Sequence, residues 1–213
     1  SGKRICTVPE NHSHGVICYG NWKLICTQEE HTHDLMCQNN PEADLESEAI
    51  WTSTFAGVTL TGDRNNDLLA IARTQLGYQE STRNFEVLED GKSINGYTRY
   101  GAWYGTPYRD WSAMFVSFCL HYAGADPEAF PQSSGASSMA ELWKNLGKYA
   151  PADTYDPVPG DLVFFADNTV GIVAEVHASA IYVIRGDVEN SVHTEVIPRT
   201  DASIVGWGST EEQ

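Results

Sequence analysis

Hydrophobic and polar positions along the chain predict helices first and a sheet afterwards. Apolar residues recur at helical spacing from about residue 65 to Gly77, from about Asp110 to Tyr122 and over 137–146. An Asn cap before Asp67 and a cap at Asp110 are expected to start the first two helices. Later segments alternate with a period of two, which is typical of antiparallel strands: 161–165, 170–176, 180–185, 192–197 and 203–207. This order predicts an α+β fold.

The remaining segments lack such periodicity. Residues 39–48 are polar and acidic, as in a linker, and 81–99 are expected to be loop-rich. The segment Ile50 to Leu60 carries Trp51, Phe55 and Val58 and is expected to lie across the main domain. We therefore divide the chain into two N-terminal repeats (1–40), a linker and packing segment (41–61) and a main domain (62–213).

The first 40 residues contain two copies of one Cys/His pattern. The spacing is Cys-x5-His-x-His-x3-Cys in the first copy and Cys-x4-His-x-His-x3-Cys in the second. Tetrahedral Zn²⁺ favours such Cys2His2 sets in structural sites. Units this small have almost no apolar core, so a cross-link is needed to hold them. The proposed ligands of the two zinc ions are Cys6, His12, His14 and Cys18 in one site, and Cys26, His31, His33 and Cys37 in the other.

Two disulfides, Cys6–Cys18 and Cys26–Cys37, are the alternative, and they suit an extracellular chain. They leave the regularly spaced histidines unexplained. The second copy, CTQEEHTHDLMC, resembles motifs found in large secreted proteins of Gram-positive gut bacteria. That resemblance implies a secreted or cell-surface protein.

The composition limits the classes of partner that the chain is expected to bind. The formal net charge is -16, from 29 acidic and 13 basic residues, which argues against nucleic acid because phosphates require Lys and Arg. No apolar run approaches the roughly 20 residues of a membrane span. Small neutral or zwitterionic ligands such as glycans and peptides are compatible with this charge, and we expect a monomer.

The most informative motif is YGAWYGTPYRDWSAMFVSFCLHYAG, at residues 100–124. It resembles the nucleophile segment W-C-A-M-F-V-S-W-C of CHAP-type cysteine amidases, papain-fold enzymes that cleave peptidoglycan. The run GDLVFF at 160–165 is similar to their G-D-(I/L/V)-x-F-F, and 60–81 resembles the opening of the same domains. The resemblance covers about 62–208 and implies a papain-like CHAP fold: N-terminal helices packed on an antiparallel sheet, here with a small zinc-binding appendage.

The three catalytic positions that this resemblance implies are all substituted. Ser112 stands at the nucleophile position, Thr169 at the position of the basic histidine, and Asp187, after Arg185 and Gly186, at the orienting position. A helix N-terminus stabilises a thiolate, whereas a serine hydroxyl depends on an adjacent base. We therefore expect a non-catalytic relative of these enzymes.

Other histidines are poor substitutes for the missing base. His121 lies about 13 Å along the same helix and His177 up to about 26 Å along one strand, while the sequence does not place His193. The start Ser1-Gly2 looks like a tag remnant, so an engineered Cys-to-Ser change at position 112 is one alternative, and a working serine enzyme is another.

Four aromatic residues precede the nucleophile position and are expected to border the cleft: Trp103, Tyr104, Tyr108 and Trp111. Aromatic faces with polar tips suit sugars or peptides, although two or three of these rings are also expected to pack the loop. Three functions stay open: a glycan- or peptide-binding module, an active peptidoglycan hydrolase whose cysteine was replaced, and a structural spacer of an adhesin.

Overall fold

A computed structural model describes residues 19–20, 23–24 and 35–210. The chain forms two compact units, one of residues 1–44 and 81–96 and the other of residues 45–80 and 97–213. Of the expected linker and packing segment 41–61, residues 45–61 belong to the same unit as the bulk of the main domain. Residues 81–96, part of the stretch 81–99 that was expected to be loop-rich, belong to the first unit.

The first unit contains short elements. Strand β1 (Tyr19–Gly20) pairs antiparallel with β2 (Lys23–Leu24), a 3₁₀ helix, η2, spans Leu35–Gln38, and β3 (Phe85–Val87) pairs antiparallel with β4 (Ile94–Gly96). The β3–β4 turn is closed by Asp90, whose carboxylate accepts the backbone N–H of Ser93 at 2.8 Å. This hairpin was not predicted from the sequence.

The second unit is built on a six-stranded antiparallel sheet with strand order β5-β10-β6-β7-β8-β9. Five of its strands fall on the predicted segments, and β5 was not predicted. The strands are β5 (Tyr149–Pro151), β6 (Leu162–Phe165), β7 (Val170–Val176), β8 (Ala180–Val188), β9 (Ser191–Pro198) and β10 (Ile204–Gly208).

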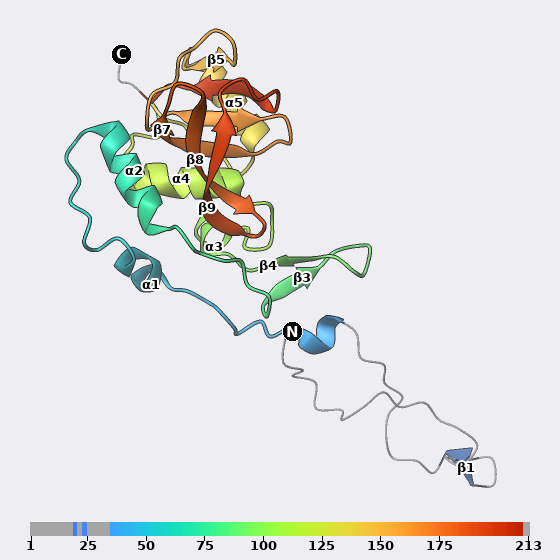
Figure 1. The fold of residues 1–213 in the computed structure, drawn as a ribbon. Helices are drawn as coiled ribbons and strands as arrows, with labels where there is room; N and C mark the ends of the chain where they lie inside the picture. Colours follow the sequence, from blue (N-terminus) through green and yellow to red (C-terminus); the bar gives the residue numbers. More distant parts are fainter. Residues whose placement is uncertain (1–18, 21–22, 25–34, 211–213) are drawn as a thin grey trace. The chain divides into compact units, whose positions relative to one another are not determined.

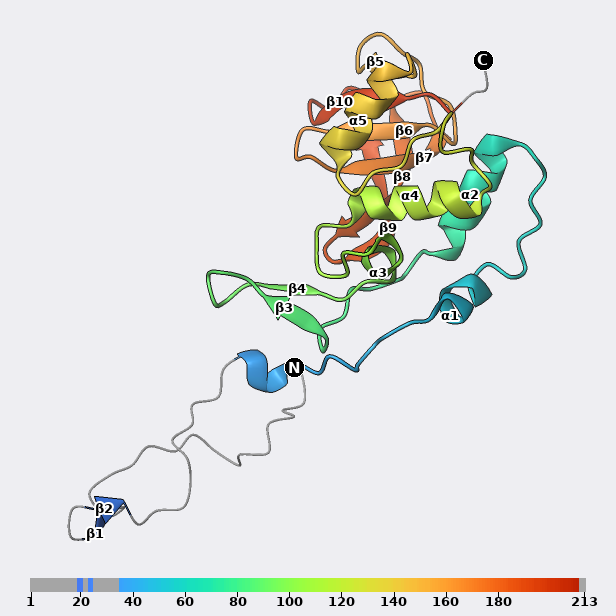
Figure 2. The ribbon, with the colours of Figure 1, turned by 180° about the vertical axis from the view of Figure 1, so that it is seen from behind.

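The helices of this unit are α1 (Glu48–Ser53), α2 (Arg64–Thr74), α3 (Arg99–Tyr104), α4 (Ser112–Tyr122) and α5 (Ala136–Asn145). Figures 1 and 2 show α4 running beside α2 and against the sheet, with α5 next to β5. The α+β class predicted from the pattern is confirmed. The papain-like identity of the fold stays a prediction.

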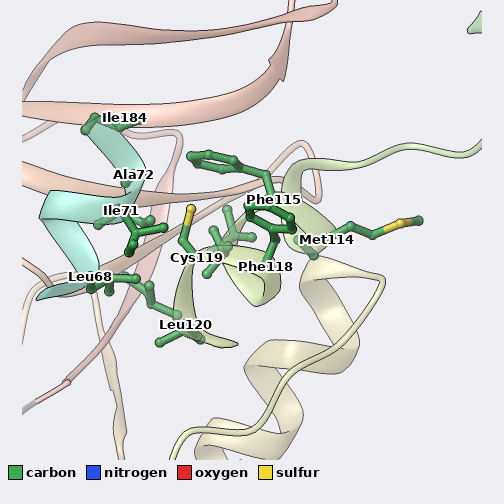
Figure 3. Packing of buried hydrophobic residues seen from close by; sticks show 14 of the residues in the cluster. Leu68, Ile71, Ala72, Met114, Phe115, Phe118, Cys119, Leu120 and Ile184 are labelled. Carbon is green, nitrogen blue, oxygen red and sulfur yellow. The ribbon is translucent and has the colours of Figure 1, made fainter. Parts of the chain in front are cut away.

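Helix α4 is the centre of the core. Every residue from Ser112 to Leu120 is buried, so the helix has no polar face over this stretch. Figure 3 shows Cys119 of α4 pointing toward Ile71 of α2, in one buried cluster with Leu68, Phe115 and Phe118. Burying one such side chain stabilises the fold by roughly 1.5–3 kcal/mol, and burial raises the pKa of the Cys119 thiol, as expected for a core cysteine.

The two faces of the sheet carry different cores. Val170, Ile172 and Ile184 pack in the same cluster as α4. Their neighbours along the strands form a second cluster on the opposite face, which contains Val163, Phe165, Val173, Ile181, Val183, Ile197, Ile204 and Trp207. Because side chains alternate along a strand, the register fixes which residues face α4.

The cap predicted for the first helix is corrected by the structure. Helix α2 is capped by Asp63, whose carboxylate accepts the Asn66 N–H at 3.0 Å, rather than by an Asn. Asp67, predicted only as a first-turn acid, is buried and accepts the N–H groups of Thr61 and Gly62 at 2.8 and 2.9 Å. These bonds hold the turn at Gly62, which has a φ of +85°.

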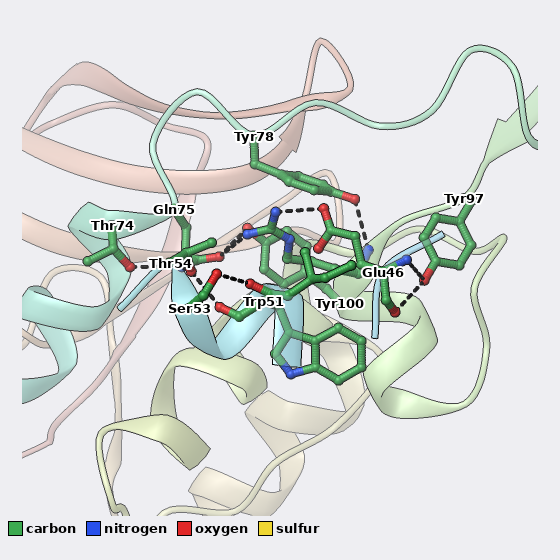
Figure 4. Close-up of polar contacts among 11 residues, drawn as sticks. Glu46, Trp51, Ser53, Thr54, Thr74, Gln75, Tyr78, Tyr97 and Tyr100 are labelled. Atoms are coloured by element: carbon green, nitrogen blue, oxygen red, sulfur yellow. Dashed lines mark hydrogen bonds and ion pairs between the residues drawn. The ribbon is translucent and has the colours of Figure 1, made fainter. Parts of the chain in front are cut away.

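The segment with α1 is fastened to the rest of the second unit by buried polar contacts (Figure 4). The Trp51 indole N–H donates to the Tyr122 hydroxyl at 2.9 Å, and the Gln75 amide donates to Thr54 Oγ1 at 3.0 Å. The Arg99 guanidinium pairs with the Glu46 carboxylate at 2.8 Å. These contacts explain why a six-residue helix, too short to be stable alone, forms here.

None of the helices within residues 35–210 is both long and apolar enough to cross a membrane.

Candidate functional site

The N-terminus of α4 is where the sequence places the candidate site. Ser112 is the first residue of this helix, and the residue before it, Trp111, is the N-cap. Asp110 was the expected cap, but it lies one residue too early and no side chain of the α4 segment caps the helix. The first N–H groups of a helix lack partners within it, so they and the macrodipole favour a negative charge here.

Asp187 supplies that charge from the sheet. Its Oδ2 accepts the backbone N–H of Trp111 at 2.8 Å. Strand β8 changes register between Arg185 and Val188, and Asp187 has a φ of +68° within this irregularity. The bulge therefore turns the carboxylate toward α4. The orienting position and the nucleophile position expected from the sequence thus lie next to each other.

Gly186 lets the strand approach the helix closely. A Cβ on this residue would lie 2.7 Å from Cζ3 of Trp111 and 2.8 Å from Cβ of Phe115. Only glycine fits such a contact without a shift of α4.

Other carboxylates surround the same tryptophan. The Trp111 indole N–H donates to Glu80 Oε2 at 2.9 Å, and Asp110 is its neighbour in sequence. The pKa of Asp187 is raised to about 7, mainly by burial and in part by the negative charges of Glu80 and Asp110, against the lowering effect of the Trp111 N–H. Asp187 is therefore a carboxyl that titrates near neutral pH. Glu80 was not predicted as a site residue, because only the fold brings it to the indole.

Ser112 has no base beside it in the part of the chain that the structure describes. The residue is 5% exposed. Within residues 35–210, its hydroxyl group has no side-chain hydrogen-bond partner. Without an acceptor for its proton, a serine hydroxyl is a weak nucleophile.

Thr169 is held by other partners. Its hydroxyl donates to Asp167 Oδ1 and accepts from the Arg185 guanidinium, both at 2.5 Å. Val170 packs in the α4 cluster, whereas a Cβ on Gly171 would meet Val183 and Arg185 on the opposite face. By alternation, Thr169 shares the face of Gly171 and points away from the α4 cluster.

Arg185 organises that opposite face. Its guanidinium donates to Glu195 at 2.6 Å and to Asp167 at 3.4 Å, and it lies 4.1 Å from the centre of the Phe165 ring. With 10% of its side chain exposed, this cation is nearly buried and is neutralised by two carboxylates. From the sequence, Arg185 was noted only as a residue preceding Asp187, with no role of its own. Its contact with Glu195 of β9 follows from the strand register and not from any local pattern.

The described histidines all lie elsewhere. His193 pairs with Arg185 across β8 and β9, its Nδ1 is 3.1 Å from Ser191 Oγ and its Nε2 is 4.0 Å from Glu195. It therefore lies on the Arg185 face. His177 contacts Glu175 at 3.0 Å, and His121, near the C-terminal end of α4, contacts the Trp103 ring.

The four predicted groove aromatics divide into two kinds. Trp111 is 1% exposed and stacks on Tyr100 at 5.1 Å, so it belongs to the core and offers no face to a ligand. Trp103 is partly buried and packs against Phe118. Tyr104 is 37% exposed and Tyr108 is partly buried, 6.4 Å from the ring of Tyr97. The packing role expected for two or three of these rings fits Trp111 and Trp103, which leaves Tyr104 and Tyr108 as ligand candidates.

A surface pocket of about 160 Å³ lies beside the strand that Thr169 precedes. Its walls include Ala140 and Lys144 of α5, Tyr149 of β5 and Phe164 of β6. None of the four aromatics lines it. The pocket has room for a single small group rather than a drug-sized ligand.

The proposed zinc sites fall mostly outside the described residues. Of their ligands only Cys37 is described, on η2 at Leu35–Gln38. Cys6, His12, His14, Cys18, Cys26, His31 and His33 lie outside. Within the described residues, no group of three or more His, Cys, Asp or Glu side chains is placed to hold a metal. Zinc in the N-terminal repeats stays a prediction.

Comparison with known proteins found no match to the chain among family models, curated proteins or solved structures.

Proposed function

We propose that this chain is a non-catalytic module of a secreted or cell-surface bacterial protein, with a CHAP-like fold that binds glycan or peptide material or serves as a scaffold. The observation that carries the proposal is the environment of Ser112. The hydroxyl lies at the N-terminus of α4, and no imidazole contacts it within residues 35–210. Asp187, the acid among the three expected catalytic positions, accepts the Trp111 N–H instead.

The second support is the environment of Thr169. In the proposed relationship this position would supply the base, yet its hydroxyl is tied to Asp167 and Arg185. Arg185 is in turn fixed by Glu195. These contacts hold the Thr169 hydroxyl on the face of the sheet opposite α4, so residue 169 does not offer Ser112 a proton acceptor.

An active peptidoglycan hydrolase is the second candidate, and one observation favours it. Position 112 is at the N-terminus of an eleven-residue helix, where a cysteine thiolate would be stabilised. The natural codon for residue 112 separates the two candidates: a cysteine codon would mean that Ser112 was introduced. The spacer function differs from the first candidate only in binding no ligand.

Ligand binding is tested by titrating peptidoglycan fragments and host-type glycans into ¹⁵N-labelled protein. We expect weak shifts of the Tyr104 and Tyr108 amides, since a single exposed ring contributes little affinity and multivalent display would be needed. Tyr104→Ala should weaken these shifts, whereas Ser112→Ala should leave them unchanged. No shift with any ligand would favour the spacer function.

A further inference from the structure

Strand β9, Ser191–Pro198, is one edge of the six-stranded sheet, and only its first half is covered. An extended segment pairs with that half. The Gly77 N–H donates to the Val192 carbonyl at 2.9 Å, the Val192 N–H donates to Tyr78, and the Glu80 N–H donates to Asn190 at 2.8 Å. The edge of β9 therefore already binds one extended backbone within the chain.

The covering segment leaves the edge at Gly77. This residue has a φ of +86°, and the chain before it turns into the end of α2. The Gln79–Ser191 bridge would place Leu76 opposite Thr194, but the Leu76 N–H already donates to the Arg73 carbonyl at the end of α2, at 3.4 Å. The helix thus ends the pairing at Val192.

The next outward-facing residues of β9 are Thr194 and Val196. Val192 directs its N–H and C=O to the outer edge, and successive residues alternate in direction. The β8–β9 register is unbroken from His193 to Pro198, so Thr194 and Val196 face outward as well. Among the described residues no backbone group pairs with these four N–H and C=O groups.

The uncovered half of β9, at Thr194 and Val196, lacks the features that usually keep an edge strand from pairing with another chain. Val196 is 58% exposed, the largest exposed fraction among the large hydrophobic residues described. Its cross-strand neighbour is Tyr182, which is also partly exposed. Pro198 ends the edge because it lacks an N–H, but neither Pro nor Lys interrupts it before that point. The opposite edge strand, β5, has three residues and ends in Pro151.

We propose that the second half of β9 binds an extended peptide of a partner protein by strand addition, with Thr194 and Val196 supplying the backbone hydrogen bonds. Strand addition of this kind derives its affinity from the backbone and its specificity from alternating side chains. On one face the peptide meets Val196 and Tyr182, which favour an apolar residue. On the other face it meets Glu195, whose Oε2 already pairs with Arg185 at 2.6 Å, so the preference for a basic residue there comes from the formal net charge of -16. The partner is thus a segment that alternates apolar and basic residues.

Charge selects a partner peptide over a second copy of the chain. Two β9 strands paired about a twofold axis would bring two Glu195 residues opposite each other, and each copy carries a formal net charge of -16. A basic peptide meets the opposite field and is attracted. A second copy is therefore an outcome for the experiment rather than the proposal.

The test titrates the peptide Ac-Thr-Val-Lys-Val-Lys-NH₂ into the full ¹⁵N-labelled chain. The proposal predicts saturable shifts at Thr194, Glu195 and Val196, and binding about 5-fold weaker when both lysines are replaced by glutamate. Val196→Pro should abolish these shifts while preserving the β8 pairing, because the lost N–H faces outward. Shifts elsewhere, or none up to millimolar peptide, would overturn the proposal.

A matched pair of milder variants guards against misfolding of the proline variant. Val196→Thr and Val205→Thr make the same chemical change at exposed valines, but β10, which carries Val205, is paired on both sides. Only Val196→Thr should weaken binding, by about 3-fold or more. Equal effects of the two variants on the affinity would contradict peptide binding at the second half of β9. Concentration-dependent dimers of peptide-free protein that Val196→Thr abolishes would assign the edge to a second copy instead.

Discussion

At the scale of single residues, Asp187 makes stability depend on pH. Burial raises its folded-state pKa to about 7 from an ordinary 3.8, so the folded protein binds a proton more tightly than the unfolded chain between these values. The unfolding free energy should therefore fall as pH rises from about 4 to about 7, by on the order of 1 kcal/mol once its partial exposure is considered.

The comparison that isolates this effect is Asp187→Asn, measured by urea unfolding at pH 4.5, 6 and 8. The amide oxygen still accepts the Trp111 N–H, and asparagine tolerates the positive φ. We expect the difference in stability between variant and parent to grow in favour of the variant as pH rises. A difference that is constant with pH would show that Asp187 does not titrate in this window.

The sequence located some residues of the site and missed others, for a physical reason. Ser112 was expected at a helix N-terminus and is found there, because the apolar spacing of 112–122 and Gly124 defines the helix. Asp187 was expected at the orienting position, and the register irregularity of β8 brings its carboxylate to the Trp111 N–H. Glu80 and Glu195 were missed because their contacts with Trp111 and Arg185 depend on tertiary pairing that no local pattern encodes.

At the scale of elements, the contact between β8 and α4 depends on Gly186. Gly186→Ala would place a methyl group within 2.7 Å of Trp111 and 2.8 Å of Phe115, both buried. We expect a loss of about 1–3 kcal/mol of unfolding free energy, because neither ring has room to move. Thermal and urea unfolding measure this loss.

Gly57→Ala is the matched control, since nothing lies within 4 Å of its added Cβ and its φ is not positive. This variant should change stability by no more than about 0.5 kcal/mol. Equal losses in the two variants would mean that β8 and α4 are not packed as described.

Long periodic elements were predictable and short ones were not. The strands from β6 to β10 and the helices α2, α4 and α5 follow apolar periodicity, so the sequence located them to within a few residues. Helices α1 and α3 have six residues each and no periodic pattern of their own. Contacts such as Trp51 with Tyr122 stabilise α1, and these form only after the domain has folded.

At the scale of the whole molecule, the N-terminal repeats should bind metal independently of the second unit. We expect two zinc ions per chain by elemental analysis, because metal binding and folding are one event in units this small. A chelator should remove them and expose the cysteines to alkylation, without changing the near-ultraviolet signal of the tryptophans buried in the second unit, Trp111, Trp143 and Trp207. Absence of zinc together with a mass about 4 Da below that of the reduced chain would identify two disulfides instead.

Whether the module is non-catalytic is tested most directly by incubating purified peptidoglycan with the chain or with its Ser112→Cys variant. The quantity measured is the release of soluble fragments. We expect no release above buffer for either protein, because a thiol at position 112 would gain the field of α4 but no adjacent base. An active peptidoglycan amidase serves as the positive control. Release by the chain as it stands, or by Ser112→Cys alone, would contradict the account and would show that a base reaches residue 112.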